Sequence, residues 1–348
     1  MDLRFGRRAA LLAPLGAALA APHVANAQAR PTVRFAFDWI LNGPYAFGIA
    51  GERQGFFREA GIDITIQRGF GSARVPLDMA AGGTFDIAMA DPTPVLRFMS
   101  QNPNNDLVAV ALLWDQAPTA VTVRADGPIT SVAQLAGRTL AAPEFDGGRQ
   151  VFPAFAAVNN IPLNSITWMS VAPELRETML VQRRADGITG FVTSTALSLR
   201  ALGMDLPAQR IFRYRENGLD FFYGSVLLTT RTYMERNPDA VRAVTHGMIR
   251  SLRWAFANRA AAIEALRARE ALTDVAIETI RQDMAMRELV DSPNVRRLGL
   301  GVMEAPRFAR QIEAVKLAFG LGDMPTPDRF YTDRFLPPAA ERQLPAVS

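Results

Sequence analysis

The chain has 348 residues and a formal net charge of +4, and 49% of its residues are hydrophobic and 21% charged, a balance typical of globular proteins. With no cysteine and two histidines, the composition excludes a disulfide framework, thiol catalysis and a Cys-ligated or multi-histidine metal site. The charge is too small for this length to indicate a nucleic-acid partner.

The first 29 residues have the pattern of a bacterial secretory signal peptide. Three arginines open the segment, residues 9–21 are apolar and uncharged, and two overlapping small-x-small sites close it. The Arg7-Arg8 pair before the apolar run suggests export by the twin-arginine route. The segment carries three arginines and one aspartate, so its removal lowers the formal charge from +4 to +2. We expect the remaining protein to be periplasmic and not to insert into the membrane.

From residue 31 onward, strand and helix patterns alternate. Alternating apolar and polar residues predict strands such as 62–66. In chain order, this region is predicted to contain strands at 33–38, 62–66, 86–90, 107–114 and 119–124, with helices at 44–61, at 72–79 and from residue 92. This β-α-β-α order implies a mostly parallel sheet with helices on both faces. Ligands of such sheets bind beyond the carboxyl ends of the strands.

A second alternating region follows the break at Asp126-Gly127-Pro128. It is predicted to contain strands near 138–142, 166–171, 187–192 and 211–214, with helices near 150–159 and 174–184. A strand at 221–229 then precedes a stretch that is helical to about residue 320 and includes a helix start at Asn237-Pro238-Asp239. The proline-rich tail, residues 325–348, is expected to wrap over the surface.

Three stretches together resemble one known family, and they occur in the family's order. They are Phe35-Ala36-Phe37-Asp38-Trp39 and Asn42 with Gly55-Phe56-Phe57-Arg58-Glu59-Ala60-Gly61-Ile62-Asp63-Ile64, then Gly82-Gly83-Thr84-Phe85-Asp86-Ile87-Ala88, then Phe222-Tyr223-Gly224 before Asn237-Pro238. This pattern is similar to that of the NMT1/THI5-like family of thiamine-precursor and sulfonate binding proteins. The resemblance implies a type II periplasmic binding protein, which delivers a small solute to the membrane permease of an ABC importer.

The resemblance also implies an α/β fold of two lobes, with mixed, mostly parallel sheets, helices on both faces and two crossover strands that act as a hinge. Lobe 1 would comprise residues 30–123 and 225–348, and lobe 2 would comprise residues 124–224. A ligand would be trapped between the lobes when they close. The two alternating regions and the helical stretch after them fit this arrangement independently.

Candidate ligand-binding residues of lobe 1 lie where predicted strands end. A carboxylate at Asp38 can accept hydrogen bonds from an amine or ring N–H, and the indole of Trp39 can stack on a flat heterocycle. Alternatively, Asp38 caps a helix and Trp39 packs between the lobes. Ser72 follows two glycines at a helix start and provides either a polar or anion site or a plain N-cap. The other candidates on these loops are Asn42, Tyr45, Asp91, Thr93 and Trp114.

Lobe 2 offers a second set of candidates. Asp146, Gly147 and Arg149 stand at a glycine-rich helix start, where glycine lets a ligand approach the backbone closely. Arg149 either pairs with a carboxylate or sulfonate or is a solvated helix residue. Further along, Thr193, followed by two more hydroxyl residues, could supply donors, and Tyr223 marks the second crossover.

The residues favour binding over catalysis. The enzyme branch of the resembled family carries a histidine that is consumed in the reaction, where this chain has Tyr45, and Leu41 replaces the proline of its motif. We therefore expect no enzymatic activity, no cofactor and no metal site, and a monomer that binds an aromatic heterocycle such as a thiamine-precursor pyrimidine. The alternatives are an aliphatic sulfonate, taurine or nitrate as the ligand, a receptor-coupled sensor as the role and, most remotely, a pyrimidine synthase-like enzyme.

Overall fold

The computed structural model of the chain describes residues 1, 30–81 and 83–346. The predicted signal peptide, apart from its first residue, lies outside the described residues, so its cleavage and export route stay predictions. Within the described part of the chain, no helix combines the length and the apolar character that crossing a membrane requires.

A first five-stranded sheet is built from both ends of the described chain. Its order is β2-β1-β3-β10-β4, with β1 parallel to β2 and β3, and with β10 antiparallel to β3 and β4. The strands are β1 (Thr32–Ala36), β2 (Asp63–Gln67), β3 (Ile87–Ala90), β4 (Leu107–Leu112) and β10 (Val226–Thr230). The late strand β10 therefore enters between strands from the early part of the chain, as the predicted return to lobe 1 requires.

Helices cover both faces of this first sheet because the side chains of each strand alternate between them. One face packs against α1 (Ala46–Arg53), α2 (Phe56–Glu59), α9 (Pro238–Ala257) and α10 (Arg259–Arg269). The other packs against α3 (Arg74–Ala80), α4 (Pro92–Gln101), α13 (Ala305–Phe319) and α14 (Pro327–Phe330). We refer to this sheet and these helices as lobe 1.

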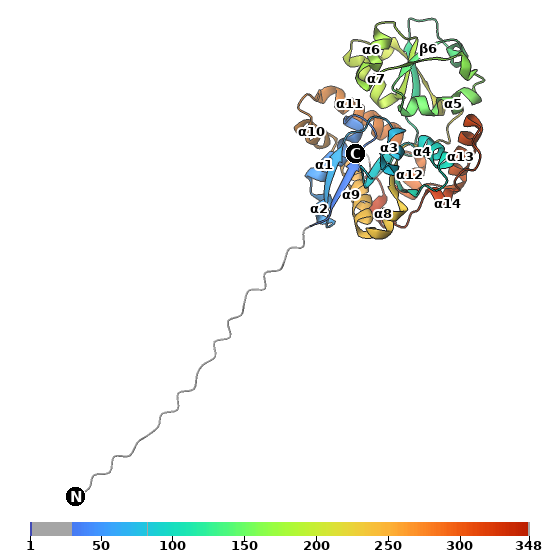
Figure 1. The fold of residues 1–348 in the computed structure, drawn as a ribbon. Helices are drawn as coiled ribbons and strands as arrows, with labels where there is room; N and C mark the ends of the chain where they lie inside the picture. The colour runs from blue at the N-terminus through green and yellow to red at the C-terminus, as the bar shows by residue number, and fades with distance from the viewer. Residues whose placement is uncertain (2–29, 82, 347–348) are drawn as a thin grey trace. The chain divides into compact units, whose positions relative to one another are not determined.

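A second five-stranded sheet has the order β7-β6-β8-β5-β9 and forms lobe 2 with α5, α6 and α7 (Figure 1). Its strands are β5 (Thr119–Arg124), β6 (Thr139–Ala142), β7 (Thr167–Ser170), β8 (Gly187–Phe191) and β9 (Gln209–Arg213). Its helices are α5 (Gly147–Val158), α6 (Arg176–Val181) and α7 (Val192–Ala201). Strand β6 runs parallel to β7 and β8, whereas β5 is antiparallel to β8 and β9.

Strand β5 corrects the predicted lobe boundary. The sequence prediction assigned residues up to 123 to lobe 1, but β5 pairs along its whole length with β8 and β9 of the second sheet. By sheet membership, the first crossover therefore lies between Leu112, the end of β4, and Thr119. The second crossover lies between Arg213 and Val226, close to the predicted position.

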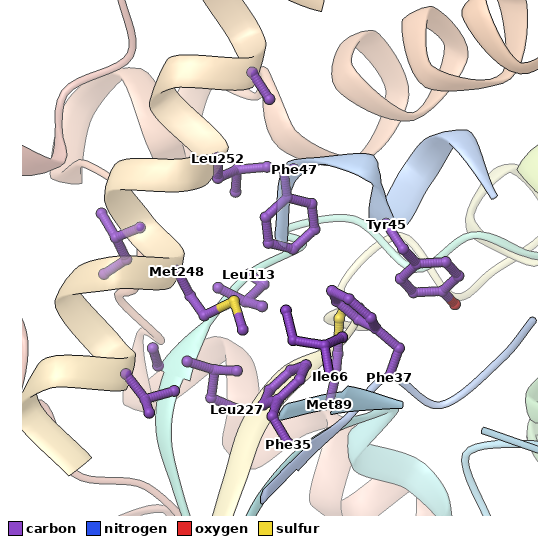
Figure 2. Close-up of a cluster of buried hydrophobic side chains, with 14 of the residues drawn as sticks. Phe35, Phe37, Tyr45, Phe47, Ile66, Met89, Leu113, Leu227, Met248 and Leu252 are labelled. Carbon is purple, nitrogen blue, oxygen red and sulfur yellow. The ribbon is translucent and has the colours of Figure 1, made fainter. Parts of the chain in front are cut away.

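Aromatic side chains form much of the lobe 1 core around strand β1. Phe35 and Phe37 meet edge to face with ring centroids 5.0 Å apart, and Phe37 also contacts the rings of Tyr45 and Phe47. Figure 2 shows these rings beside α9, whose Met248 and Leu252 point toward them and belong to the same cluster. Burial of each such side chain contributes about 1.5–3 kcal/mol, so this cluster anchors the strand end that carries Asp38.

The remaining helices follow β10. They are α8 (Arg231–Arg236), α11 (Val275–Ala285), a π-helical turn (Met286–Val290) and α12 (Pro293–Leu298). Helix α11 packs against α10 of lobe 1 and also against α7 of lobe 2. The long helix predicted at 44–61 is interrupted, since Gly55 adopts a φ of 81° between α1 and α2. The tail packs on lobe 1, where Phe330 and Phe335 are fully buried.

Candidate functional site

A small cavity lies where the strand ends of the two lobes face each other. Its volume is about 10 Å³, which is roughly the space of one water molecule. Residues of both lobes line it, namely Asp38, Trp39 and Ser72 from lobe 1 and Asp146, Gly147, Arg176, Phe191 and Ser194 from lobe 2. Asp38 and Trp39 follow β1, Ser72 lies between β2 and α3, and Phe191 ends β8. The other lining residues lie at the starts of α5, α6 and α7, so the cavity has the position expected for ligands of such sheets.

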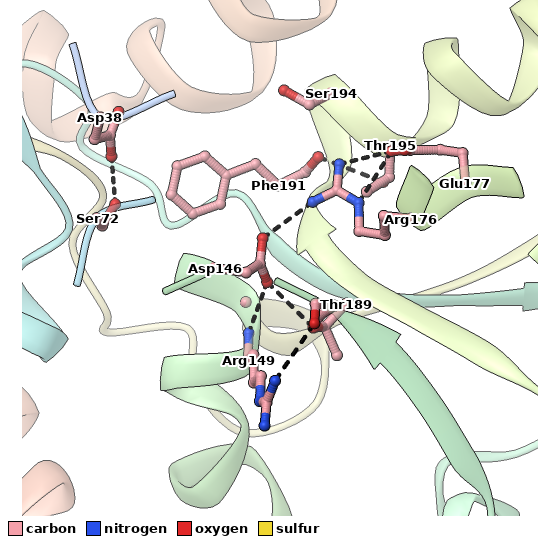
Figure 3. A network of polar contacts seen from close by, with 12 residues as sticks. Asp38, Ser72, Asp146, Arg149, Arg176, Glu177, Thr189, Phe191, Ser194 and Thr195 are labelled. Carbon is pink, nitrogen blue, oxygen red and sulfur yellow. Dashed lines mark hydrogen bonds and ion pairs between the residues drawn. The ribbon is translucent and has the colours of Figure 1, made fainter. Parts of the chain in front are cut away.

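On the lobe 1 side, Asp38 is a buried carboxyl held by two hydroxyls. The Tyr45 hydroxyl donates to Asp38 Oδ1 over 2.9 Å, and the Ser72 hydroxyl donates to Asp38 Oδ2 (Figure 3). Burial raises the pKa of Asp38 to about 6, although both hydroxyl donors oppose the rise by stabilising the charged form. At neutral pH this carboxylate is therefore ionised, and no cationic side chain among the described residues pairs with it.

On the lobe 2 side, Asp146 is a buried carboxyl with a cation. It caps α5 by accepting the Arg149 N–H over 2.8 Å, and it accepts the Thr189 hydroxyl over 3.1 Å. Arg176 Nη1 lies 3.0 Å from Asp146 Oδ2, and Arg176 Nη2 lies 2.6 Å from Glu177 Oε1 (Figure 3). Burial raises the pKa of Asp146, and the Arg176 charge opposes that rise. Arg176 is thus compensated by two carboxylates.

Aromatic rings form the floor of the cavity. The Arg176 guanidinium lies 5.0 Å from the centre of the Trp39 ring, across the two lobes. Outside the lining, the ring of Trp114 contacts Tyr45 at 5.5 Å and Phe191 at 6.0 Å between centroids. A Cβ added at Gly147 would lie 2.7 Å from the Phe191 ring, so only glycine fits beside this wall.

Five of the thirteen predicted ligand-binding residues line the cavity, and others support it from behind. The lining residues are Asp38, Trp39, Ser72, Asp146 and Gly147. Tyr45 holds Asp38, Trp114 backs the aromatic wall, and Thr193 is a fully buried neighbour of Ser194. Asn42 lies at the mouth, where its Nδ2 donates to the Ser194 hydroxyl over 3.2 Å.

The structure does not bring four of the predicted residues into the cavity wall. Asp91 caps α4 by accepting the Thr93 N–H over 2.7 Å, so this pair serves the helix start. The guanidinium of Arg149 turns to Ser170 and to the ring of Trp168. Tyr223 accepts a hydrogen bond from the Glu304 N–H and lies under Arg307. A direct ligand contact from any of these four stays a prediction.

Sequence reasoning missed Arg176 and Phe191. Phe191 ends β8 and could have been found from its place at a predicted strand end. Arg176 begins α6, and the signal was a helix start directly after a predicted strand of lobe 2. Nothing in the local sequence shows that its guanidinium crosses to Trp39, because that contact depends on how the lobes pack.

A larger groove opens from the cavity and shares Trp39, Arg176 and Ser194 with it. Its volume is about 460 Å³, and it runs between the loop at residues 39–42, the loop before α11, and α6 and α7. Helix α11 contributes Glu278 and Arg281 to its wall. This groove connects the cavity to solvent along the contact between the lobes.

Two comparisons with known proteins point to the same family. Residues 43–262 match the family described as NMT1/THI5 like. A formylaminopyrimidine-binding protein from Halalkalibacterium halodurans is 22% identical over 240 residues, which cover 69% of this chain and 71% of that protein. The predicted family is confirmed.

Solved structures confirm the predicted fold. An alkanesulfonate-binding protein from Xanthomonas axonopodis pv. citri has a TM-score of 0.68 at 14% identity, covering 88% of this chain and 100% of its own. The periplasmic nitrate-binding protein of Synechocystis has a TM-score of 0.66 at 12% identity, covering 88% of this chain and 87% of its own. The two-lobed fold is therefore that of periplasmic binding proteins.

The relatives also bear on the predicted role. The three similar proteins named above are each described as binding proteins. This confirms the prediction of a solute-binding protein of the ABC-importer type rather than an enzyme. The matched region covers more than half of the sequence, and the chain belongs to the NMT1/THI5-like family.

Proposed function

We propose that the protein captures a small amino-substituted aromatic heterocycle, of the thiamine-precursor pyrimidine class, between its two lobes in the periplasm and presents it to an ABC permease. One observation carries the proposal: Asp38, a buried carboxyl that pairs with no cation among the described residues, lines the cavity beside the indole of Trp39. Carboxylates accept hydrogen bonds from amino groups and ring N–H groups, and an indole stacks on a flat ring.

The charge of the cavity favours a ligand that donates hydrogen bonds. Among the described residues that line it, Arg176 is the one cation, and its guanidinium is already paired with Asp146 and Glu177. Asp38 is bonded by neutral hydroxyls and keeps an uncompensated charge at neutral pH. An anion placed here would approach Asp38 without a free cation to balance the repulsion.

The size of the cavity requires movement on binding. About 10 Å³ is too small for an aromatic ring, since a single water already needs roughly that space. Trp39 and Arg176 belong to different lobes and face each other 5.0 Å apart. A planar ligand would enter as the lobes separate and would be enclosed between these two groups when they close.

The related formylaminopyrimidine-binding protein supports this class of ligand. The sulfonate and nitrate alternatives have weaker support from the site. The Arg149 guanidinium faces Trp168, the Ser72 hydroxyl is committed to Asp38, and the N-terminus of α5 is capped by Asp146. The groups on which an anion site was predicted to depend are thus engaged elsewhere.

A matched ligand panel tests the proposal. The purified exported protein, unfolded and refolded to remove any bound solute, would be titrated with a 4-aminopyrimidine and with the 4-oxo pyrimidine of the same shape. An alkanesulfonate, taurine and nitrate would be titrated in parallel. We expect stabilisation by the amino compound of about 2.7 kcal/mol at a hundredfold excess over Kd, and a clear loss for the oxo compound. Stabilisation by the anions alone, or chemical change of the ligand, would contradict the proposal.

A further inference from the structure

Two residues outside the cavity wall connect the two sides of the cavity. They are Glu278 and Arg281, one helical turn apart on α11, where Arg281 Nε lies 3.0 Å from Glu278 Oε2. Helix α11 contacts α10 in lobe 1 and α7 in lobe 2, so it lies along the contact between the lobes. Neither residue is among those that line the cavity.

Arg281 holds the lobe 2 side. Its Nη1 donates to the carbonyl oxygen of Ser194 over 2.6 Å and to that of Thr193 over 3.2 Å, and its Nη2 lies 3.3 Å from the Ser198 hydroxyl. All three partners belong to α7, and Ser194 itself lines the cavity. The position of this cavity wall is therefore tied to the guanidinium of Arg281.

Glu278 holds the lobe 1 side. Its Oε2 accepts the backbone N–H of Gly43 over 2.6 Å, at the end of the loop that carries Trp39. A Cβ at Gly43 would lie 2.9 Å from the Gln282 backbone nitrogen, so glycine lets this loop rest directly on α11. Asn42, in the same loop, donates to the Ser194 hydroxyl and spans the two walls directly.

Because Arg281 is buried, its bonds to Glu278 and to α7 also compensate its charge. The side chain is 6% exposed, so its charge must be met by protein groups. A cation near the N-terminus of α7 meets the positive end of that helix dipole, an arrangement that does not favour the helix by itself. The bonds to the carbonyl oxygens of α7 offset this cost while the two lobes remain in contact, whereas Glu278, on the same helix as Arg281, stays paired with it in either arrangement.

We propose that Arg281 is a positioning residue that, with Glu278, fixes the separation of the two cavity walls and thereby slows ligand release. The proposal rests on the proposed function in one respect, that the ligand is held between the lobes. If the walls separate, Arg281 exchanges its carbonyl partners for water, so the contact can break and reform. Loss of Arg281 should therefore favour separated lobes while leaving the groups that touch the ligand in place.

The experiment measures the lobes first without ligand. Because the chain has no cysteine, spin labels can be placed at two introduced cysteines, Arg58→Cys on lobe 1 and Leu163→Cys on lobe 2, both exposed positions. Distances would be measured by pulsed electron paramagnetic resonance in the otherwise unchanged protein and with Arg281→Gln. We expect Arg281→Gln to lengthen and broaden the distance distribution, and Arg281→Lys, which keeps the charge but fewer donors, to do so less.

The matched control is Arg259→Gln. Arg259 Nη1 pairs with Asp283 over 2.8 Å, joining α10 to α11, but makes no bond to α7 among the described residues. It should leave the distance distribution unchanged. The proposal is overturned if Arg281→Gln behaves like this control. If Arg281→Gln does not fold, Arg281→Lys decides the question in the same way.

Ligand kinetics provide the second measurement. With a 4-aminopyrimidine as the probe, we expect Arg281→Gln to raise Kd about tenfold through faster release, with an unchanged association rate. A change confined to association would contradict the proposal. If the probe does not bind the unaltered protein, the proposed function fails, whereas the label distances without ligand still test the role of Arg281.

Discussion

Two buried aspartates face the same cavity from opposite lobes, and their surroundings differ. Asp38 is 1% exposed and Asp146 is 2% exposed, and each follows a strand that ends near the cavity. Asp146 accepts a helix N–H, a hydroxyl and a guanidinium. Asp38 accepts the hydroxyls of Tyr45 and Ser72. One carboxyl is built into an ion pair, and the other is not.

This difference separates structural and ligand-binding roles. The charge of Asp146 compensates Arg176 and caps α5, so its partners are already supplied by the protein. Within residues 30–81 and 83–346, no cation pairs with Asp38, and burial raises the pKa of this carboxyl to about 6. A buried carboxylate of this kind is costly without a ligand, and a donor on the ligand relieves that cost. We therefore expect substitutions at the two aspartates to have different consequences.

The largest effect should come from breaking the ion pair of lobe 2. Replacing Arg176 with methionine would leave Asp146 and Glu177 as uncompensated buried charges, because Arg176 is 2% exposed. We expect a loss of about 3–5 kcal/mol in the free energy of unfolding, measured with guanidinium chloride. The control is Arg68→Met, which removes an exposed pair with Glu174 and should cost at most about 1 kcal/mol. Equal losses would show that the buried pair contributes no more than a surface pair.

The next effect concerns ligand affinity. Asp38→Asn should weaken binding of the aminopyrimidine by about 1.5–3 kcal/mol, roughly ten- to a hundredfold in Kd, because it removes an ionised acceptor. Its stability at neutral pH should not fall, since no cation loses its partner. Asp146→Asn should lower stability more than Asp38→Asn does, because it leaves Arg176 with Glu177 alone. Calorimetric titration and unfolding curves of both variants separate these outcomes. If Asp146→Asn instead weakened binding more and Asp38→Asn lowered stability more, Asp146 would be the ligand-binding carboxyl and Asp38 the structural one.

The ionisation of Asp38 should make ligand binding depend on pH. Binding through ionised Asp38 should weaken about tenfold in Kd, or about 1.4 kcal/mol, as pH falls from 7 to 5 through its pKa of about 6. The stability contribution has the opposite sign. Because the folded pKa lies above the ordinary value of 3.8, the folded state binds the Asp38 proton more tightly than the unfolded state does. The stabilisation that this proton gives is fully present below about pH 4 and is lost as the pH rises through 6. Asp38→Asn should remove both dependences, and an unchanged pH profile in that variant would exclude Asp38 as their source.

Sequence reasoning predicted the lobe 1 wall better than the lobe 2 wall, for physical reasons. Asp38, Trp39 and Ser72 follow a strand or a glycine loop, and strand ends of a parallel sheet meet at one edge. Arg176 was missed because its contact with Trp39 joins elements that are far apart in the chain and depends on lobe packing. The boundary at residue 123 was wrong because β5 is apolar enough to fit either sheet, and only its pairing with β8 and β9 decides.

The direction of the Arg149 side chain also could not be predicted from the local sequence. Of the substitutions proposed, Arg149→Gln should have the smallest effect on ligand affinity. The backbone N–H of Arg149 serves the site by bonding Asp146, a role that any residue except proline fills, while its guanidinium lies 4.8 Å from the ring centre of Trp168. Arg149→Gln should therefore leave the Kd for the aminopyrimidine unchanged within about twofold and cost about 0.5–1 kcal/mol in stability through the lost cation–π contact. The measurement is a titration of the variant beside Asp38→Asn under the same conditions. A loss of affinity comparable to that of Asp38→Asn would mean that the guanidinium turns into the cavity when ligand binds, and it would favour the sulfonate and nitrate alternatives over the heterocycle.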